Sequence, residues 1–203
     1  MRKSLKRLGI CALIVCLVWA AGIVSNKQML QNGLIRLHVV AASDSDADQD
    51  LKLLVRDAVI SSLRENMNHV KDIEEAKAYL RENLPKIEAL AKGVLQKAGI
   101  HDTVTVSLRP EEFGTRVYDT FTLPAGVYEA LRITIGAGEG HNWWCVVFPA
   151  LCVGATVEEF EETAHCAGLS DSLTAALAGE VDYEVRFLIL DALGKLENFL
   201  HKG

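Results

Sequence analysis

The sequence lacks an excess of basic residues, and this absence excludes one class of function at the outset. Its 203 residues contain 21 Lys and Arg against 27 Asp and Glu, which gives a net charge of −6 at pH 7. Sequence-independent binding to nucleic acid requires a basic face that displaces phosphate counterions. We therefore expect no nucleic-acid partner.

The sequence also lacks the motifs of the common enzyme classes. It contains no G-x-S-x-G, H-E-x-x-H, P-loop or CxxC, and the glycine-rich run 136–140 does not have the spacing of a dinucleotide fingerprint. His141 lies four residues before Cys145, about 13 Å along an extended strand, which is too far for a thiol–imidazole pair. The same distance argues against a metal site made with Cys152. We predict no catalytic residues, no cofactor and no metal.

The one long apolar run of the chain lies at its amino terminus. Residues 1–9 carry four cations and no acid, and residues 10–24 are apolar apart from Gly22. This pattern is typical of an export signal. The run is long for the core of a cleaved signal and short for a membrane-spanning helix, so a cleaved signal peptide and a membrane anchor both stay open. In either case the positive-inside rule places everything after Ser25 outside the cytoplasm.

The remainder of the chain is acidic and has the composition of a globular domain. Removing the four cations of residues 1–25 from the total of 21 leaves 17 basic residues against 27 acidic ones, or −10. We divide the chain into a signal peptide or anchor (1–25), a polar linker (26–33) and a single domain (34–203). A domain of this size buries enough surface to fold without staples.

Export changes how the five cysteines are interpreted. Cys11 and Cys16 lie in the apolar segment, which leaves Cys145, Cys152 and Cys166. Three thiols allow one intramolecular disulfide at most. Cys145 and Cys152 are the favoured pair, because the six residues between them include a proline that can bend the chain and an extracytoplasmic site permits oxidation. Two reduced, buried thiols are the alternative.

Hydrophobic periodicity predicts helices after an initial strand. Residues 34–40 read as a strand in which Arg36 and His38 share one face, with His38 expected to be a partly exposed sheet residue. Ser45 caps a helix over residues 48–67, and Asp72 caps a second one. We expect Pro85 to interrupt this second helix and to open a further one that ends at Gly99.

The second half of the chain predicts more strands. Residues 104–108, 128–135 and 143–148 alternate or are rich in β-branched residues, and the glycine-rich run 136–140 reads as a flexible hairpin loop between the last two. Residues 183–189 read as a final strand, followed by a short helix with Leu193, Leu196 and Leu200 inward. The predicted fold class is α/β of the α+β type, a two-layer domain with helices on a mostly antiparallel sheet.

The segment 113–145 resembles an interaction surface, because aromatic residues, arginines and turn formers concentrate there. Tryptophan, tyrosine and arginine dominate binding hot spots. Neighbouring strand residues point to opposite faces, so of two adjacent tryptophans one joins the core while the other meets solvent or a partner. The residues that we predict to contact a partner are Arg116, Tyr118, Arg132, Trp143 and Trp144.

Several strings in the chain resemble the stage II sporulation protein R family. They are HVVAASDS from His38, FGTR from Phe113, PAGVYEALRITIG from Pro124 and NWWCVVFPALC from Asn142. The resemblance extends over nearly all of the chain from Leu34 onward. Ala42 and Ala150 depart from the asparagine and the proline expected in the family, which places any special role of these two positions in doubt.

The resemblance implies a signalling protein of endospore-forming bacteria that is made in the forespore. Such a protein is exported into the space between the forespore and mother-cell membranes. There it activates the membrane-embedded aspartic protease that processes the precursor of sigma-E, and it has no catalytic residues of its own. The membrane is a second partner if the amino-terminal segment is not cleaved.

An exported enzyme or ligand-binding module that acts on cell-wall material is the alternative function. It would use the aromatic segment as its cleft. A deep concave site with convergent carboxylates, one of them with a raised pKa, would favour this alternative, whereas a convex or shallow aromatic face would favour signalling.

Overall fold

The computed structural model describes residues 27–118, 121–149, 171–178 and 184–201, together with isolated positions between residues 7 and 25. Its strands are β1 (Ile35–Val40), β2 (Val104–Phe113), β3 (Arg116–Val117), β4 (Thr122–Leu123), β5 (Gly126–Ile135) and β6 (Asn142–Phe148). Its helices are α2 (Asp46–Asn66), α3 (Ile73–Lys97), α5 (Asp171–Leu177) and α6 (Glu184–His201).

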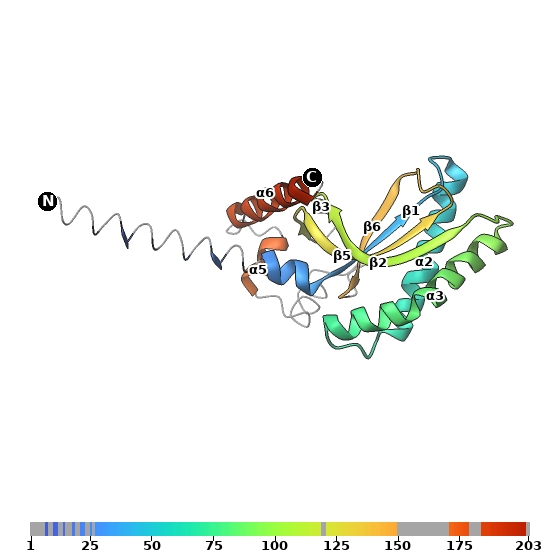
Figure 1. The fold of residues 1–203 in the computed structure, drawn as a ribbon, viewed down its shortest axis with the longest axis horizontal. Coiled ribbons are helices and arrows are strands. Elements are labelled where there is room, and N and C mark those ends of the chain that lie inside the picture. Colours follow the sequence, from blue (N-terminus) through green and yellow to red (C-terminus); the bar gives the residue numbers. More distant parts are fainter. Residues whose placement is uncertain are drawn as a thin grey trace.

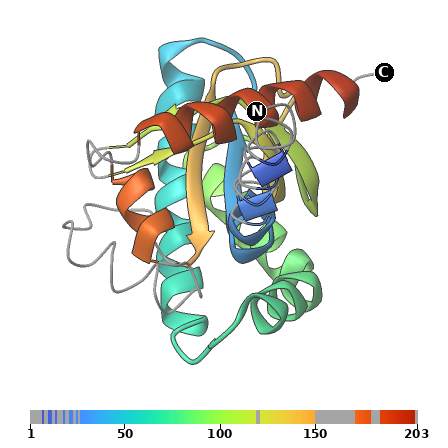
Figure 2. The same cartoon turned by 90° about the vertical axis from the view of Figure 1, so that its left-hand side faces the viewer.

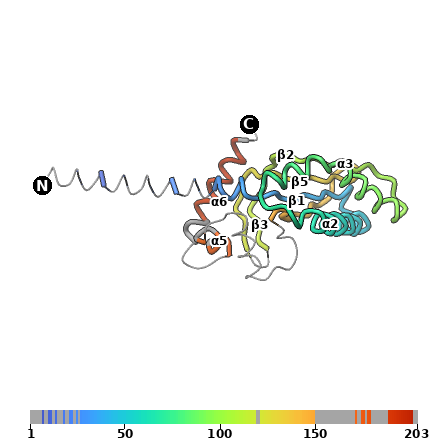
Figure 3. Tube along the Cα trace, turned by 90° about the horizontal axis from the view of Figure 1, so that it is seen from below, coloured from blue at the N-terminus to red at the C-terminus, as the bar shows by residue number. Residues whose placement is uncertain are grey.

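A four-stranded sheet with the order β2-β5-β1-β6 forms the centre of the fold (Figure 1). β1 is parallel to β5, whereas β1–β6 and β2–β5 are antiparallel. β3 and β4 form a separate two-stranded sheet. α2 and α3 pack on one face of the main sheet, and α6 crosses the strands at one end of the other face (Figure 3). The predicted α+β class and the mostly antiparallel sheet are confirmed, and α6 adds partial cover to the second face.

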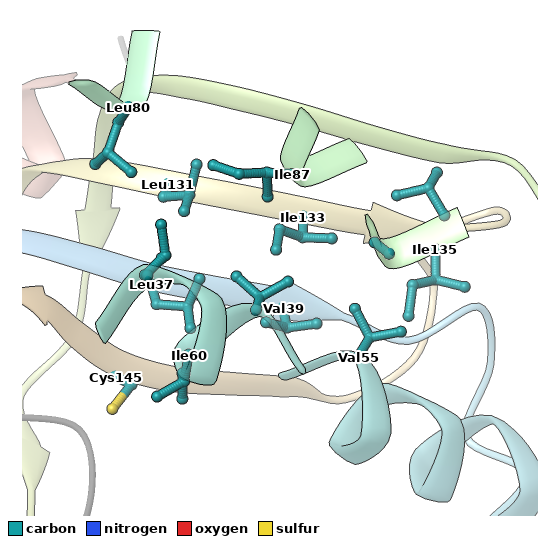
Figure 4. Packing of buried hydrophobic residues seen from close by; sticks show 14 of the residues in the cluster. Leu37, Val39, Val55, Ile60, Leu80, Ile87, Leu131, Ile133, Ile135 and Cys145 are labelled. Carbon is teal, nitrogen blue, oxygen red and sulfur yellow. The ribbon is translucent and has the colours of Figure 1, made fainter. Parts of the chain in front are cut away.

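The apolar core lies between the sheet and the two long helices. Leu37 and Val39 of β1 and Leu131 and Ile133 of β5 are all fully buried, and they face α2 and α3 (Figure 4). Burial of an aliphatic side chain contributes about 1.5–3 kcal/mol, so this layer supplies much of the stability of the domain.

The starts of both long helices follow the prediction. The Ser45 side chain accepts a hydrogen bond from the Asp48 amide, and the Asp72 carboxylate accepts from the amides of Glu74 and Glu75 at 3.0 and 2.9 Å. Each cap satisfies amide groups that have no partner within their own helix.

Pro85 does not interrupt the second helix, which contradicts the prediction. α3 continues from Ile73 to Lys97 with Pro85 inside it. A proline removes one helical hydrogen bond, which is a local cost. Leu80 before it and Ile87 and Ala91 after it are buried in the same core. The packing of this common face holds the two halves of α3 as one helix.

The loop between β5 and β6 is not a hairpin, because β1 lies between these two strands. The loop instead crosses the end of β1, where the Gly140 amide donates to the Ala41 carbonyl at 3.0 Å. Gly138 has a φ of +67°, and a Cβ at this position would lie 2.4 Å from Thr134. Lys52 of α2 donates to the His141 carbonyl at 3.0 Å. The glycines therefore allow the loop to pass close to the end of β1 and to form hydrogen bonds with it.

The carboxy-terminal segment is helical where a strand was predicted. α6 begins at Glu184 and therefore includes most of residues 183–189. Its packed side includes Leu190 and Leu193, whereas Leu196 and Leu200, which we expected to point inward, are 54% and 69% exposed. Gly194 approaches the Ala125 carbonyl so closely that a Cβ would lie 1.5 Å from its oxygen. This contact fixes which side of α6 faces the sheet.

Of the predicted linker, 26–33, the structure describes residues 27–33, which are helical and contact α6. Leu30 is fully buried, and both Lys27 Nζ and Gln31 Nε2 contact the Glu197 carboxylate, at 2.8 and 2.6 Å. Most of residues 1–25 lie outside the described residues, so the export segment stays a prediction. Within the described part of the chain, no helix has both the length and the apolar character needed to cross a membrane.

Candidate functional site

The second face of the sheet carries charged and aromatic side chains where the first carries aliphatic ones. Strand alternation places Arg36 and His38 on this face, as predicted, opposite the core residues Ile35, Leu37 and Val39. In the sheet register His38 lies between Arg132 of β5 and Trp144 of β6. These neighbours belong to a group that we call the sheet-face cluster: Arg36, His38, Glu111, Phe113, Arg116, Tyr118, Tyr128, Arg132 and Trp144.

Glu111 joins two cationic or basic side chains of this cluster. Its carboxylate lies 2.9 Å from His38 Nδ1 and 3.2 Å from Arg132 Nη1. Burial alone would raise the pKa of Glu111, but hydrogen bonds from His38 and Arg109 and the charge of Arg132 outweigh it and lower the pKa to about 2. Since a carboxylate only accepts, His38 Nδ1 is the donor in this pair.

His38 is buried, with 4% of its surface exposed, which contradicts the expectation of a partly exposed residue. The Trp144 ring stacks on it with centroids 4.0 Å apart, and the Phe113 ring lies 6.0 Å away. Its Nε2 atom has no hydrogen-bond partner among the described residues. These large aromatic neighbours bury a position that sequence alternation alone would leave at a wet surface.

Arg36 is a fully buried cation held by aromatic rings. Its guanidinium lies 4.0 Å from the centroid of Phe113 and 5.2 Å from that of Tyr128, and Nη2 donates to the Tyr118 hydroxyl at 2.7 Å. Burial lowers the pKa of Arg36. Its Nε and Nη1 atoms have no partner within the described part of the chain. Ring faces are attractive to a cation but replace only part of its hydration.

Arg116 and Trp144 form the outer part of the cluster. The Arg116 guanidinium lies 4.5 Å from the centroid of the Trp144 ring. The same ring stacks on His38 and makes an edge contact with Phe113. Both residues are half-buried, and Arg132 keeps 28% of its side chain exposed. Together they combine an aromatic ring with flanking cations, residue types that suit contact with a protein partner.

Trp143 lies on the opposite face of the sheet from Trp144. There the Arg56 guanidinium of α2 stacks over its ring at 4.2 Å, and Trp143 is 38% exposed. The prediction that adjacent tryptophans point to opposite faces is therefore confirmed. Of the five residues predicted to contact a partner, the structure brings together Arg116, Tyr118, Arg132 and Trp144 and separates Trp143 from them.

Cys145 follows the two tryptophans and is disulfide-bonded and 4% exposed. Cys152, its predicted partner, lies outside the described residues, so the pairing of these two cysteines stays a prediction. Among the described residues, no group of three or more His, Cys, Asp or Glu side chains could hold a metal ion.

Glu111, which links His38 to Arg132, was not among the residues predicted from the sequence. We expected the strand to end at Leu108, whereas β2 continues to Phe113 through Pro110. Proline is tolerated there because β2 is an edge strand of the sheet. Extending the alternation of residues 104–108 by a few positions would have placed Glu111 and Phe113 on the same face.

Comparison with known proteins shows which family the chain resembles. The family model described as "Stage II sporulation protein R (spore_II_R)" matches residues 31–158. The chain belongs to the stage II sporulation protein R family. The chain is also 43% identical over 133 residues to the stage II sporulation protein R of Bacillus subtilis (strain 168), a match that covers 63% of this chain. The match spans 59% of the length of that relative. No solved structure matches the chain significantly.

The match to the stage II sporulation protein R family includes the whole sheet and every member of the sheet-face cluster. Membership implies a role in sporulation. α5 and α6 follow the matched range, so their part in the fold is established by the structure of this chain.

Proposed function

We propose that this chain is an exported signal of sporulation. It is made in the forespore and crosses the forespore membrane into the space between the two membranes. There it activates the membrane-embedded aspartic protease that processes the pro-sigma-E precursor in the mother cell. The observation that carries this proposal is membership of a family of signalling proteins, with 43% identity to the Bacillus subtilis relative.

An activator of this kind needs no catalytic residues. It shifts the protease by binding the active state more tightly than the inactive one, and a preference of about 5 kcal/mol suffices for a near-complete switch. A deep concave site with a carboxyl group of raised pKa would favour the alternative, an exported enzyme or ligand-binding module that acts on cell-wall material. Among the described carboxyl groups with a clear shift, Asp44, Glu111, Asp191 and Glu197, each pKa is lowered.

The sheet-face cluster is the proposed contact surface for the protease. Arg116, Trp144 and Arg132 combine the residue types of binding hot spots with partial exposure. The Arg36–Tyr118 hydrogen bond and the Glu111 contacts lie beneath them and hold their positions. Because Trp143 lies on the other face, we place it outside this surface.

The function is tested by deleting the gene in its sporulating host and following processing of the pro-sigma-E precursor. We expect unprocessed precursor to accumulate, and reintroduction of the wild-type chain to restore processing. Normal processing in the deletion strain would overturn the proposed function, whatever the contact surface is.

The contact surface is tested in the same strain with a matched pair of substitutions. Arg116→Ala removes an Arg–Trp stack of 4.5 Å from the sheet-face cluster, and Arg56→Ala removes a similar stack of 4.2 Å from the opposite face. Each stack contributes about 0.5–1 kcal/mol, so both variants should stay folded. We expect Arg116→Ala to reduce processing and Arg56→Ala to leave it unchanged. The reverse result, or full processing by both variants, would overturn this surface.

A further inference from the structure

α6 carries a stripe of large apolar side chains that point away from the domain. Leu188, Leu196, Phe199 and Leu200 are 64%, 54%, 75% and 69% exposed. Leu188, Leu196 and Phe199 lie on one side of the helix with the exposed Ala192, at successive spacings of four, four and three residues. A contiguous apolar surface of this kind on a soluble domain marks a contact site.

The fold does not need this stripe to hold α6 in place. The opposite side of the helix docks through buried Leu190 and through the close contact of Gly194 with Ala125. Asp191 accepts from the Ala125 amide at 2.9 Å, and Asn198 donates to the Phe113 carbonyl at 2.8 Å. The outer residues are therefore free to contact something other than the domain.

α6 lies close to the end of the apolar amino-terminal run. Lys27 and Gln31 both contact Glu197 of α6, and the apolar run 10–24 ends three residues before Lys27. Three residues span at most about 11 Å. Figure 2 shows α6 running across the end of the molecule that faces the viewer. Any bilayer that holds residues 10–24 must therefore begin close beside α6.

We infer that α6 lies flat on the lipid surface of the membrane that residues 10–24 enter, with Leu188, Leu196, Phe199 and Leu200 in contact with lipid. A helix that exposes an apolar side binds at a bilayer surface in this way, and here the opposite side of α6 is held by the domain. The remainder of the chain after Ser25 carries a net charge of −10, so apolar contact rather than attraction to anionic lipid provides the binding. The inference rests on the predicted export segment and does not depend on protease activation.

The test uses the full chain reconstituted into phosphatidylcholine vesicles with brominated acyl chains, which quench nearby tryptophan. Phe199→Trp and Leu188→Trp place a reporter near each end of α6. Leu54→Trp is the matched control, because Leu54 is 56% exposed on α2, which packs on the opposite face of the sheet. Native Trp19, within the apolar run, reports whether that run has entered the bilayer.

We expect the emission added by Phe199→Trp and by Leu188→Trp to be lost in brominated vesicles about as fully as that of Trp19. The emission added by Leu54→Trp should persist. Added emission that persists in both α6 variants would overturn the inference, as would quenching at only one end of the helix or an unquenched Trp19. Emission from the α6 variants that changes with protein concentration and not with bromination would assign the stripe to a second copy of the chain instead.

Discussion

The two faces of the central sheet bury their side chains by different means. On the face under α2 and α3, residues such as Leu37, Val39 and Leu131 are fully buried among other aliphatic side chains. On the other face, Arg36 and His38 are buried among aromatic rings and a single carboxylate. Apolar packing gives stability without directional demands, whereas a buried polar group must be matched by particular partners. The second face therefore depends on a few specific contacts, whereas the first depends on the total apolar surface that it buries.

The largest effect is expected on the aliphatic face. Leu131→Ala removes a fully buried side chain from the centre of the core. It should lower the free energy of unfolding by about 2–5 kcal/mol, because lost transfer energy and the residual cavity both contribute. Denaturant unfolding measures this change. Leu54→Ala, at an exposed position, should change the value by about 0.5 kcal/mol at most. Equal effects of the two variants would contradict the assignment of the core.

The adjacent tryptophans compare the two faces directly. Trp144→Ala removes the half-buried ring between His38 and Arg116 and should cost about 3 kcal/mol of unfolding free energy, the low end of the range for removing a large aromatic side chain from a core. Trp143→Ala should cost about 1 kcal/mol, because its ring is partly exposed and its Arg56 contact is weak. Thermal unfolding of both variants tests the order. A larger decrease in unfolding free energy with Trp143→Ala than with Trp144→Ala would contradict the assignment of Trp144 to the more closely packed site.

The Glu111 carboxylate should make the stability of the second face depend on pH. Its pKa is about 2 in the fold against 4.5 for an unperturbed glutamate, so it stabilises the fold above pH 4.5 and loses this contribution as the pH falls toward 2. Glu111→Gln should therefore be less stable than wild type by about 1–2 kcal/mol at neutral pH. The difference in unfolding free energy between Glu111→Gln and wild type should disappear as the pH falls toward 2. Unfolding free energies measured from pH 7 to 2 test this, and a gap that is constant with pH would exclude the charge as its cause.

The smallest effect is expected for Arg36, despite its complete burial. Arg36→Met replaces a desolvated cation, two of whose nitrogen atoms lack partners in the described residues, with an apolar side chain that also packs on Phe113. Replacing a buried ion pair by apolar residues is often neutral or stabilising, and the same reasoning applies to a buried cation whose hydration is only partly replaced. We expect the free energy of unfolding to change by about 1 kcal/mol at most. A decrease in the free energy of unfolding as large as that of Leu131→Ala would mean that Arg36 makes a major contribution to stability.

The sequence predicted those parts of the fold that depend on near neighbours. The caps at Ser45 and Asp72 and the shared face of Arg36 and His38 follow from residue type and spacing. Residues 183–189 form a short apolar run, which suits a strand as well as a buried helix. In the structure most of this run belongs to α6, which docks along one side through distant groups such as Ala125. Local pattern did not contain that information.

The candidate site shows the same limit. Its arginine and tyrosine side chains could be chosen from composition, but their grouping required the order β2-β5-β1-β6. The predicted hairpin of β5 and β6 would have placed these strands side by side and left β1 elsewhere. Insertion of β1 between them brings His38 against Trp144. Strand order depends on contacts between residues about 100 positions apart, which local spacing does not report.

The central place of β1 also sets when the domain can fold. β1 is the first strand of the chain, yet both of its neighbours in the sheet, β5 and β6, come at residues 126–135 and 142–148. If the chain is exported as we propose, the part that follows the export segment enters the translocation channel first, so the middle of the sheet emerges early and has no partners until about three quarters of the chain has followed. Such a chain crosses the membrane unfolded, and its sheet closes only after β6 has left the channel.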